Sequence, residues 1–239
     1  MSEIKYKRVL LKLSGEALSG KDGIINYEYI QEIGTVVRRC IAEGAQIAIV
    51  VGAGNIWRGR QGLAMDRVRA DHMGMLATVI NSIGMKDALV RAGLDAHVMT
   101  PVMMETFTEP YLCDKAVEYL EKGSVVVLAG GSGAPFFSTD TAAVLRAAEI
   151  GADVTLMAKN IDAIYTADPR KDPSAEPLRQ VDYMHILENH LTTIDITATA
   201  FAMENKMPIH IFGLDNPKNI SRVIMGEQLG TIVKGGVQK

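Results

Sequence analysis

The sequence predicts an α/β fold, a single-domain three-layer αβα sandwich around a mostly parallel sheet. Short, near-continuous aliphatic runs alternate with longer stretches of helical periodicity along the 239 residues. Such runs are typical of strands that helices cover on both faces, and the alternation predicts βαβ crossovers. A hydrophobic content of 48% with only 5% aromatic residues also favours aliphatic layers over a β-sandwich.

The first part of the chain supplies two successive βαβ units. Residues 9–13, 46–51 and 96–100 are aliphatic runs of strand length. The stretches 27–43 and 71–92 between them carry apolar residues at helical spacing and are long enough to be the crossover helices. This order predicts neighbouring parallel strands with helices packed on the sheet.

The rest of the chain continues the alternation. The further predicted strands are 124–129, 153–158, 208–212 and a short 230–233, and the further predicted helices are 114–122, 140–150, 193–205 and 218–225. The stretch 166–177 is rich in proline and charge, and we expect an ordered excursion over the active face rather than a linker. Since no linker, internal repeat or low-complexity tract is present, we expect one domain over residues 1–239.

The composition limits the possible partners and locations of the protein. A net charge of −3 gives no reason to expect nucleic acid or an anionic membrane as a partner. Cys40 and Cys113 are far apart and lack metal-type spacing, as do the five histidines, so we expect reduced thiols and no histidine metal site. The first residues are polar, and no apolar stretch approaches about 18 residues. We therefore expect a soluble, cytoplasmic protein.

A lysine lies inside the first predicted strand, which reads Val-Leu-Leu-Lys-Leu. Buried there, Lys12 loses its hydration, a cost that a fold tolerates only where an anion meets the charge. Ser14 and Gly15 follow at once, where the chain must turn. Because open α/β sheets bind ligands beyond the carboxyl ends of their strands, we expect a site for a negatively charged group there. The loops that would build it are 14–16, 52–55, 130–135 and 159–162.

Glycine-rich segments near these strands are similar to nucleotide-binding motifs without matching them. The segment 15–22 nearly fits the Walker A pattern, but Asp22 stands where a Ser or Thr hydroxyl would bind magnesium. We expect Lys21 to be a solvated loop charge. The turns that follow the second and fourth strands depart from G-x-G-x-x-G at the third glycine, which is replaced by Trp57 and Phe136. Their glycines still let backbone N–H groups approach a phosphate closely.

Four residues near predicted helix starts have both a structural and a functional interpretation. Ser138 and Thr139 either cap the helix that begins near residue 140 or touch substrate, and Asp140 either belongs to that cap or meets a metal ion. Asp71 is either the N-cap of the helix predicted for 71–92 or an acceptor of ribose hydrogen bonds. For all of these residues, capping is a sufficient explanation of the residue type, so both interpretations stay open.

Two further side chains lie close to the loops. Arg58 follows Gly54 by four residues and is either a surface charge or a bidentate clamp on phosphate oxygens. Tyr165 lies in the segment 160–169, which follows a strand and ends in the turn-forming pair Asp-Pro. It is either a half-buried loop residue or a surface on which a purine stacks.

Together these segments resemble the bacterial uridylate kinases, the UMP kinases of the amino acid kinase fold, over nearly the whole chain. The segments that carry the resemblance are 12–18 (KLSGEAL), 54–59 (GNIWRG), 71–78 (DHMGMLAT), 135–140 (PFFSTD), 165–169 (YTADP) and 225–227 (MGE). The resemblance implies transfer of a phosphoryl group from ATP to UMP, with Mg²⁺, in pyrimidine nucleotide biosynthesis. It also implies a homohexamer, activation by GTP and inhibition by UTP.

The resemblance assigns roles to individual positions. Implied as catalytic are Lys12, Arg58 and Asp140, the last near magnesium. Implied on the ATP side are Lys12, Leu13, Ser14, Gly15, Gly54, Arg58, Asn160, Tyr165 and Asp168. Implied around UMP are Ala53, Asp71, Ser132, Gly133, Ala134, Pro135, Phe136, Phe137, Ser138 and Thr139. Gly20, Lys21, Asp22, Gly23, Ile24 and Ile25 match the place associated with GTP activation.

Two positions depart from the family pattern. The usual Gly-Gly-Gly-Asn is here Gly-Ala-Gly-Asn, so one close approach of the backbone must accommodate the methyl group of Ala53. The usual Gly-Asn-Pro-Phe is here Gly-Ala-Pro-Phe, and Ala134 has no side chain that can hydrogen-bond a nucleotide. Both changes lie on the side assigned to UMP and bear on the preference for the acceptor.

The implied chemistry fits what the chain offers. A phosphate oxygen of UMP is already ionised at neutral pH, so the reaction needs no general base. The obstacle is bringing two anions together, and preorganised cations and N–H groups stabilise that state. Two other functions stay open, namely a kinase for a carboxylate or carbamate acceptor and a nucleotide-binding regulator that has lost catalysis.

The predicted helix after Asp71 is apolar on more than one side. A stripe at helical spacing contains Leu76, Val79, Ile80 and Ile83, while Met75, Met85 and Leu89 lie off that stripe. An outer helix of a doubly wound sheet has no further layer of its own chain above it, so the excess apolar surface predicts contact with a partner subunit. We expect a homo-oligomer, and the resemblance implies a hexamer built from dimers.

Overall fold

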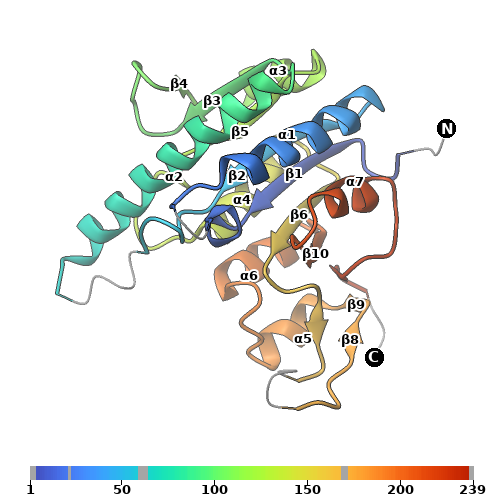
Figure 1. Ribbon diagram of the computed structural model, residues 1–239. Coiled ribbons are helices and arrows are strands. Elements are labelled where there is room, and N and C mark those ends of the chain that lie inside the picture. The colour runs from blue at the N-terminus through green and yellow to red at the C-terminus, as the bar shows by residue number, and fades with distance from the viewer. Residues whose placement is uncertain (1–3, 21–22, 59–63, 168–171, 237–239) are drawn as a thin grey trace.

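The computed structural model describes residues 4–20, 23–58, 64–167 and 172–236 and contains a nine-stranded sheet between two layers of helices (Figure 1). The strand order is β4-β3-β5-β2-β1-β6-β10-β11-β9, and every pairing in this sheet is parallel except that of β10 with β11. A separate antiparallel pair is formed by β7 and β8. The predicted fold class, a mostly parallel α/β sandwich, is confirmed.

The elements have the following bounds. The strands are β1 Arg8–Leu13, β2 Gln46–Val51, β3 Ala96–Thr100, β4 Glu109–Pro110, β5 Val125–Leu128, β6 Val154–Lys159, β7 Ile164–Tyr165, β8 Pro177–Leu178, β9 Gln180–Val181, β10 Ile209–Gly213 and β11 Thr231–Val233. The helices are α1 Tyr27–Ala42, α2 Arg67–Arg91, α3 Cys113–Glu121, α4 Thr139–Glu149, α5 Tyr183–Glu188, α6 Ile196–Glu204 and α7 Lys218–Ile224, with a 3₁₀ turn η1 at Gly15–Leu18.

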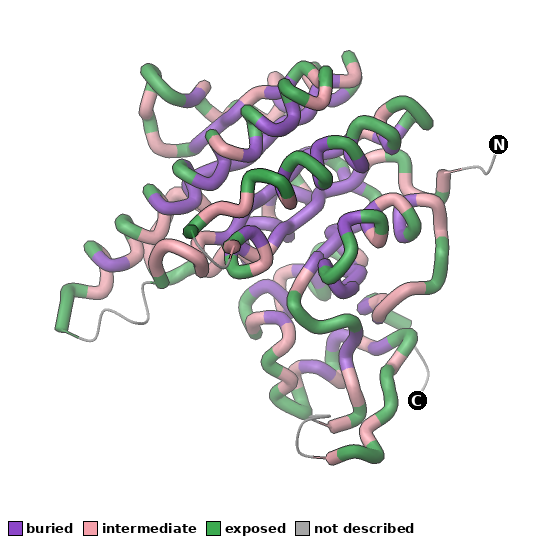
Figure 2. The backbone as a smooth tube through the Cα atoms, in the orientation of Figure 1, coloured by how far each residue is buried: buried purple, intermediate pink, exposed green. Residues whose placement is uncertain are grey.

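Two cores lie on opposite faces of the sheet, because successive side chains of a strand point to opposite sides. In β1, Leu11 and Leu13 join the core that α1, α2 and α7 cover. Leu10 points the other way and joins the core under α3, α4, α5 and α6. Figure 2 shows the buried strands between helices whose outer sides are exposed. The near-continuous aliphatic strands are therefore explained by burial on both faces.

The predicted elements are all present, with differences at the ends of two helices. The helix predicted for 193–205 begins at Ile196, where Asp195 is the N-cap and accepts a hydrogen bond from the Ala198 N–H at 2.7 Å. Helix α5 and the short strands β4, β7, β8 and β9 were not predicted. Pieces of two to six residues are too short to show a periodicity of either kind.

Helix α2 begins one turn earlier than predicted, which corrects the interpretation of Asp71 as an N-cap. The cap is Asp66, whose carboxylate accepts from the Arg69 N–H at 3.1 Å. Asp71 therefore lies inside the first turns of the helix, and its side chain is free for another role. The turn from Arg67 onward has few apolar residues, so the hydrophobic pattern started too late.

Most of the apolar stripe predicted on α2 faces away from the sheet, although an ordinary amphipathic helix turns such a stripe inward. Met85 and Leu89 are buried against the sheet, whereas Leu76, Ile80 and Ile83 are exposed. The inward side also carries three buried polar residues, Thr78, Asn81 and Ser82. Helix α2 therefore does carry surplus apolar surface. The predicted stripe supplies this outer surface, except for Val79, which is buried.

The sheet has a topological switch point at β1. The chain leaves β1 to form β2 on one side, and later returns to place β6 on the other side. The carboxyl ends of β1, β2 and β6 lie at the same edge because these pairings are parallel. In open α/β sheets such a point is where ligands bind.

Both cysteines are free thiols, and among the described residues no helix is long and apolar enough to cross a membrane.

Candidate active site

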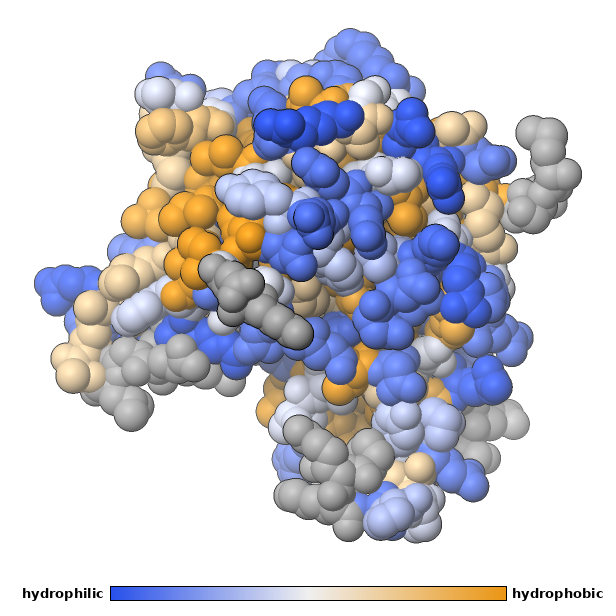
Figure 3. Space-filling model, in the orientation of Figure 1, coloured by the Kyte–Doolittle hydropathy of each residue, from blue (hydrophilic) through white to orange (hydrophobic). Residues whose placement is uncertain are grey.

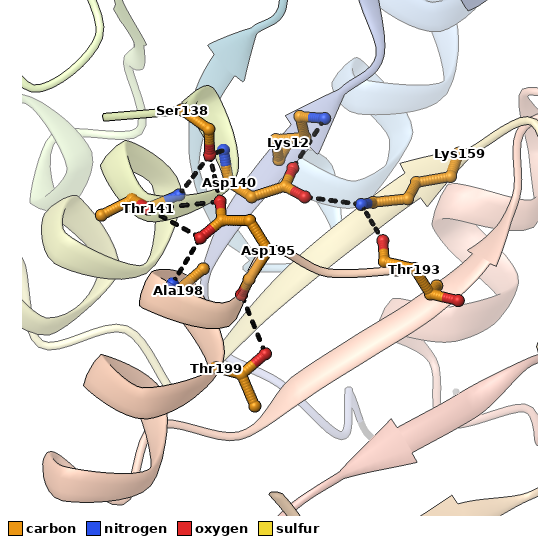
Figure 4. Close-up of polar contacts among 9 residues, drawn as sticks. All are labelled: Lys12, Ser138, Asp140, Thr141, Lys159, Thr193, Asp195, Ala198 and Thr199. Atoms are coloured by element: carbon orange, nitrogen blue, oxygen red, sulfur yellow. Dashed lines mark hydrogen bonds and ion pairs between the residues drawn. The ribbon is translucent and has the colours of Figure 1, made fainter. Parts of the chain in front are cut away.

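Two lysines and one aspartate form a buried ion cluster at the switch point (Figure 4). The ammonium Nζ of Lys12 lies 2.9 Å from Oδ1 of Asp140, and Nζ of Lys159 lies 2.7 Å from Oδ2. The three side chains are at most 14% exposed. The anion that a buried strand lysine requires is thus a carboxylate of its own chain.

The register of the sheet explains why these side chains meet. Lys12 pairs with Met157 across β1 and β6, and Lys159 lies two residues further along β6, so both lysines point to the same face. That face is the one on which α4 packs, and Asp140 is the second residue of α4. The ends of one helix and two neighbouring strands therefore place the three charges within contact distance.

The surroundings of the cluster shift the pKa of Asp140 and of Lys159. Burial alone raises the pKa of the Asp140 carboxyl, but the ammonium groups of Lys12 and Lys159 outweigh it and hold this pKa far below its usual range. Burial lowers the pKa of Lys159, and Asp140 offsets part of that effect. Asp140 is therefore ionised at neutral pH and serves as a fixed negative charge between two cations.

The start of α4 is tied to the start of α6. Ser138 is the N-cap of α4, and its Oγ accepts from the N–H groups of Asp140 at 3.0 Å and Thr141 at 3.2 Å. The Ser138 hydroxyl donates to the carboxylate of Asp195, and Oγ1 of Thr141 lies 3.1 Å from the same carboxylate. Lys159 donates to the carbonyl of Thr193 just before α6. The structural interpretation of Ser138 as a cap is confirmed, and this network fixes Asp140 between the lysines.

The glycine-rich turns after β1 and β2 pack directly on each other. A Cβ atom at Gly15 would lie 2.5 Å from the carbonyl oxygen of Gly52, so only glycine fits there. The N–H of Gly52 donates to the Leu13 carbonyl at 2.9 Å. The turn at Ser14–Gly15 and the turn at Gly52–Gly54 therefore form one continuous backbone surface beside Lys12.

The polar residues on the inner side of α2 hold these turns in place. Asn81 donates from Nδ2 to the Gly52 carbonyl at 2.7 Å, and its amide pairs with the amide of Asn55 in both directions, at 2.8 and 3.0 Å. Thr78 accepts through Oγ1 from the Gly130 N–H at 2.8 Å. Buried amides and hydroxyls must be hydrogen-bonded, and here their partners are the loops of the site.

Most residues assigned to the UMP side lie on one segment, Ser132 to Thr139, and Asp71 lies on the first turns of α2, while Ala53 lies apart on the loop after β2. Oδ2 of Asp71 accepts from the backbone N–H of Phe136 at 2.8 Å. The Ser132 hydroxyl lies 3.2 Å from both the N–H and the carbonyl oxygen of Ala134. Phe136 and Phe137 are exposed, and the other members of the segment from Ser132 to Thr139 are half-buried. The structure thus brings Asp71 and this segment together beyond the ion cluster.

Other predicted site residues lie further from the cluster or make different contacts. Arg58 forms an ion pair with Glu16, and Ala53 accepts through its carbonyl from the N–H of Trp57 at 2.9 Å. Tyr165 donates to the carboxylate of Asp162 at 3.0 Å, and Asn160 is exposed at the end of β6. The Gly20 N–H donates to the Gly23 carbonyl at 3.1 Å, and the Ile24 carbonyl accepts from Asn55. Lys21, Asp22 and Asp168 lie outside the described residues.

Comparison with known proteins agrees with the geometry. A model of the amino acid kinase family matches residues 7–213. The chain belongs to the amino acid kinase family. Within this family, the crystal structure of UMP kinase from Bacillus anthracis superposes with a TM-score of 0.92 at 34% identity over 97% of both chains. UMP kinase from Ureaplasma parvum superposes with a TM-score of 0.90 at 31% identity over 97% of this chain and 100% of that one.

A more distant member of the family has the same fold. Uridylate kinase from Archaeoglobus fulgidus superposes with a TM-score of 0.72 at 26% identity, over 94% of this chain and 99% of that one. The resemblance drawn from the sequence motifs is confirmed by these comparisons. The sequence interpretation of this amino acid kinase included Lys159 only as the first residue of the loop 159–162, without a role, and it omitted Asp195 and Asn81. The structure places all three residues at the site.

Proposed function

We propose that this protein transfers the γ-phosphoryl group of ATP to UMP, giving ADP and UDP in pyrimidine nucleotide biosynthesis. The observation that carries the proposal is the buried Lys12–Asp140–Lys159 cluster at the switch point, in a chain whose structural neighbours are UMP kinases. Two ammonium groups held apart by one carboxylate suit a site that must receive phosphate oxygens from two nucleotides.

The chemistry follows from the charges. Both reacting nucleotides are anions, and the transferred phosphoryl group passes through a state with dispersed negative charge. In this proposal Lys12 and Lys159 stabilise that charge from the floor of the crevice, with the backbone surface of Gly15 and Gly52 beside them. Asp140 keeps both ammonium groups oriented before substrates arrive, so little reorganisation accompanies the reaction.

The nucleotide roles that the sequence assigned stay part of this proposal. On the donor side are Lys12, Leu13, Ser14, Gly15, Gly54, Arg58, Asn160, Tyr165 and Asp168. On the acceptor side are Ala53, Asp71, Ser132, Gly133, Ala134, Pro135, Phe136, Phe137, Ser138 and Thr139. Two contacts bear on the assignment, because Ser138 is engaged as a helix cap and Arg58 pairs with Glu16.

The carboxylate of Asp140 fits a magnesium ion that arrives with ATP. Magnesium in kinases is held mainly by substrate phosphates and waters with one or two carboxylates. Among the described residues no group of three acidic, histidine or cysteine side chains converges on a metal position, and Asp140 is the carboxylate nearest the lysines. In this proposal Asp140 would contact the ion or its water, and the ion would neutralise phosphate charge when bound.

We expect the enzyme to phosphorylate UMP far faster than CMP, AMP or GMP, with ATP and magnesium. Two features of the site are the reason. One is the cationic cluster, and the other is the contact between Asp71 and the Phe136 N–H, since both residues belong to the set assigned to the nucleoside acceptor. Steady-state release of ADP with each of the four acceptors measures the preference. Equal rates for all four, or no rate with UMP, would overturn the proposal. A rate only with a carboxylate or carbamate acceptor would indicate a different kinase of the same fold.

We also propose that the enzyme is a homohexamer built from dimers. Leu76, Ile80 and Ile83 on α2, together with Ile24 and Tyr27 near the start of α1, form an exposed apolar face. Figure 3 shows this patch in orange over α2. Apolar patches of this kind are typical of subunit interfaces. Regulation by GTP and UTP and a cytoplasmic location stay predictions drawn from the sequence.

Light scattering coupled to size exclusion tests the assembly. At micromolar concentration we expect a mass near six times the 25.9 kDa of one chain. Ile80→Asp, which places a charge in the patch, should shift the protein to smaller species. Met184→Asp changes a comparably exposed apolar residue on α5 and should leave the mass unchanged. A wild-type monomer would contradict the proposal.

A further inference from the structure

The first turns of α2 touch the loops on both sides of the candidate site. Trp57, on the loop after β2, donates its indole N–H to the carbonyl of Ala70 at 2.9 Å. One residue further on, Asp71 accepts from the Phe136 N–H on the loop before α4. A single short stretch of helix therefore contacts both the loop after β2 and the loop before α4.

Arg67 completes the contact with the UMP-side loop. Its Nε lies 2.8 Å from Oδ2 of Asp71, the same oxygen that accepts from the Phe136 N–H. Its guanidinium carbon also lies 5.2 Å from the centre of the Phe136 ring, which is within the range of a cation–π contact. Oδ1 of Asp71 accepts no hydrogen bond within the described part of the chain, so that oxygen is open to a ligand hydroxyl.

Phe136 is held in a backbone conformation that it would not adopt unaided. Its φ is 72°, in the left-handed region that favours glycine. Gly131 and Gly133 on the same loop also have positive φ, but they carry no Cβ and incur no such penalty. A strained residue of this kind persists only where its surroundings hold it, and strain of this kind clusters at functional sites. Here the surroundings are the Asp71 carboxylate on its N–H and the Arg67 guanidinium on its ring.

We propose that Arg67 is a positioning residue for the nucleoside of the acceptor. It fixes the Asp71 carboxylate and the strained Phe136 as one unit, which we call the α2 latch (Arg67, Asp71 and Phe136). The proposal rests on the proposed function, because it assumes that UMP binds against this loop. Arg67 itself does not touch the reacting phosphates, and its loss weakens UMP binding by releasing the unit that UMP contacts.

Arg67→Met and Arg67→Lys test the latch. The Arg67 side chain is 41% exposed, so both variants should fold. Loss of one charge-assisted hydrogen bond to Asp71 should raise KM for UMP about tenfold in Arg67→Met, while KM for ATP and kcat change by less than about twofold. Arg67→Lys keeps a cation near the carboxylate and the ring and should recover part of the loss. Arg69→Met is the matched control, since Arg69 lies on the same helix with a side chain 79% exposed.

A second comparison separates the latch from a general effect of Arg67 on the helix. Glycine at position 136 needs no support for a positive φ, so Phe136→Gly removes the strain together with the ring. In a Phe136→Gly background, Arg67→Met should therefore raise KM for UMP by less than about threefold, an interaction expected of residues in contact. An undiminished tenfold effect in that background would overturn the latch, as would parallel changes in KM for UMP and for ATP.

Equilibrium titration of UMP by calorimetry separates the latch from the function on which it rests. Wild-type protein that binds no UMP would overturn the proposed function and the latch together. Wild-type protein that binds UMP, with an affinity that Arg67→Met leaves unchanged, would overturn the latch alone. The expected result is measurable binding to the wild type that weakens about tenfold in Arg67→Met, in step with KM.

Discussion

Replacement of Lys12 by alanine should lower kcat by about 10² or more, the scale observed when one preorganised contact to transition-state charge is removed. Lys12 is buried near the carboxyl end of β1, and its ammonium group is fixed by Asp140 at 2.9 Å. In the proposed reaction that ammonium meets phosphate oxygens as negative charge disperses. Among the described residues, Lys159 is the one other cation that pairs with Asp140. Because Lys159 already contacts Oδ2 of Asp140, it cannot also take the place of Lys12 at Oδ1.

The variant should fold, because Asp140 keeps its second partner, Lys159, at 2.7 Å. Circular dichroism and unfolding by denaturant check this point, and initial rates at saturating ATP and UMP give kcat. Lys122→Ala, which removes an exposed lysine paired with Glu118 on the surface of α3, is the control and should leave kcat unchanged. A folded Lys12→Ala enzyme with nearly normal kcat would reject the role of Lys12.

The sequence located the site through a local conflict between residue type and position. A lysine inside an aliphatic strand is costly unless an anion meets it, and this conflict is visible without any structure. Which anion meets it was not predictable in the same way. Asp140 is 128 positions away by residue number, and its position beside Lys12 depends on the strand order and the packing of α4.

Lys159 was predicted only as part of the loop 159–162 and received no role of its own, although it also ends a buried strand. Its relation to Lys12 depends on the register between β1 and β6, which decides that both side chains point to the face of α4. A single sequence fixes the strands but leaves that register open. Asp195 was missed for a related reason, since the helix that it caps was predicted to begin at residue 193 and not at Ile196.

Helix α2 shows where periodicity gives no unique answer. Both sides of the helix carry large apolar residues, so the pattern alone does not decide which side faces the sheet. The buried side contains Thr78 and Asn81, which hydrogen-bond the loops after β5 and β2. Polar residues thus occupy the inner side because the loops of the site require partners, and apolar residues occupy the outer side. The hydrogen bonds that these loops require therefore override the ordinary inward apolar stripe.

The charge of Asp140 also predicts a large effect on stability. In Asp140→Asn, two buried ammonium groups lose their shared counter-charge, and removal of one partner from a buried ion pair costs about 3 kcal/mol or more. We expect the free energy of unfolding in the absence of nucleotide to fall by about that amount. The helix cap is not the reason, because Ser138 supplies the cap and the backbone N–H of residue 140 is retained. Denaturant unfolding measures the loss.

The same variant should weaken the dependence of activity on magnesium while UMP binding changes little. Phosphate groups of bound ATP bring negative charge to Lys12 and Lys159, so ATP should recover more stability in Asp140→Asn than in the wild type. The magnesium concentration for half-maximal activity should rise about tenfold, the scale of one lost charge-assisted contact. Asp87→Asn, which breaks an exposed pair with Arg91 at 2.7 Å, is the control and should change neither quantity. An unchanged magnesium titration together with unchanged stability would mean that Asp140 neither balances the lysines nor contacts the ion. A loss of stability with an unchanged titration would mean that Asp140 balances the charge of the lysines but does not contact the ion.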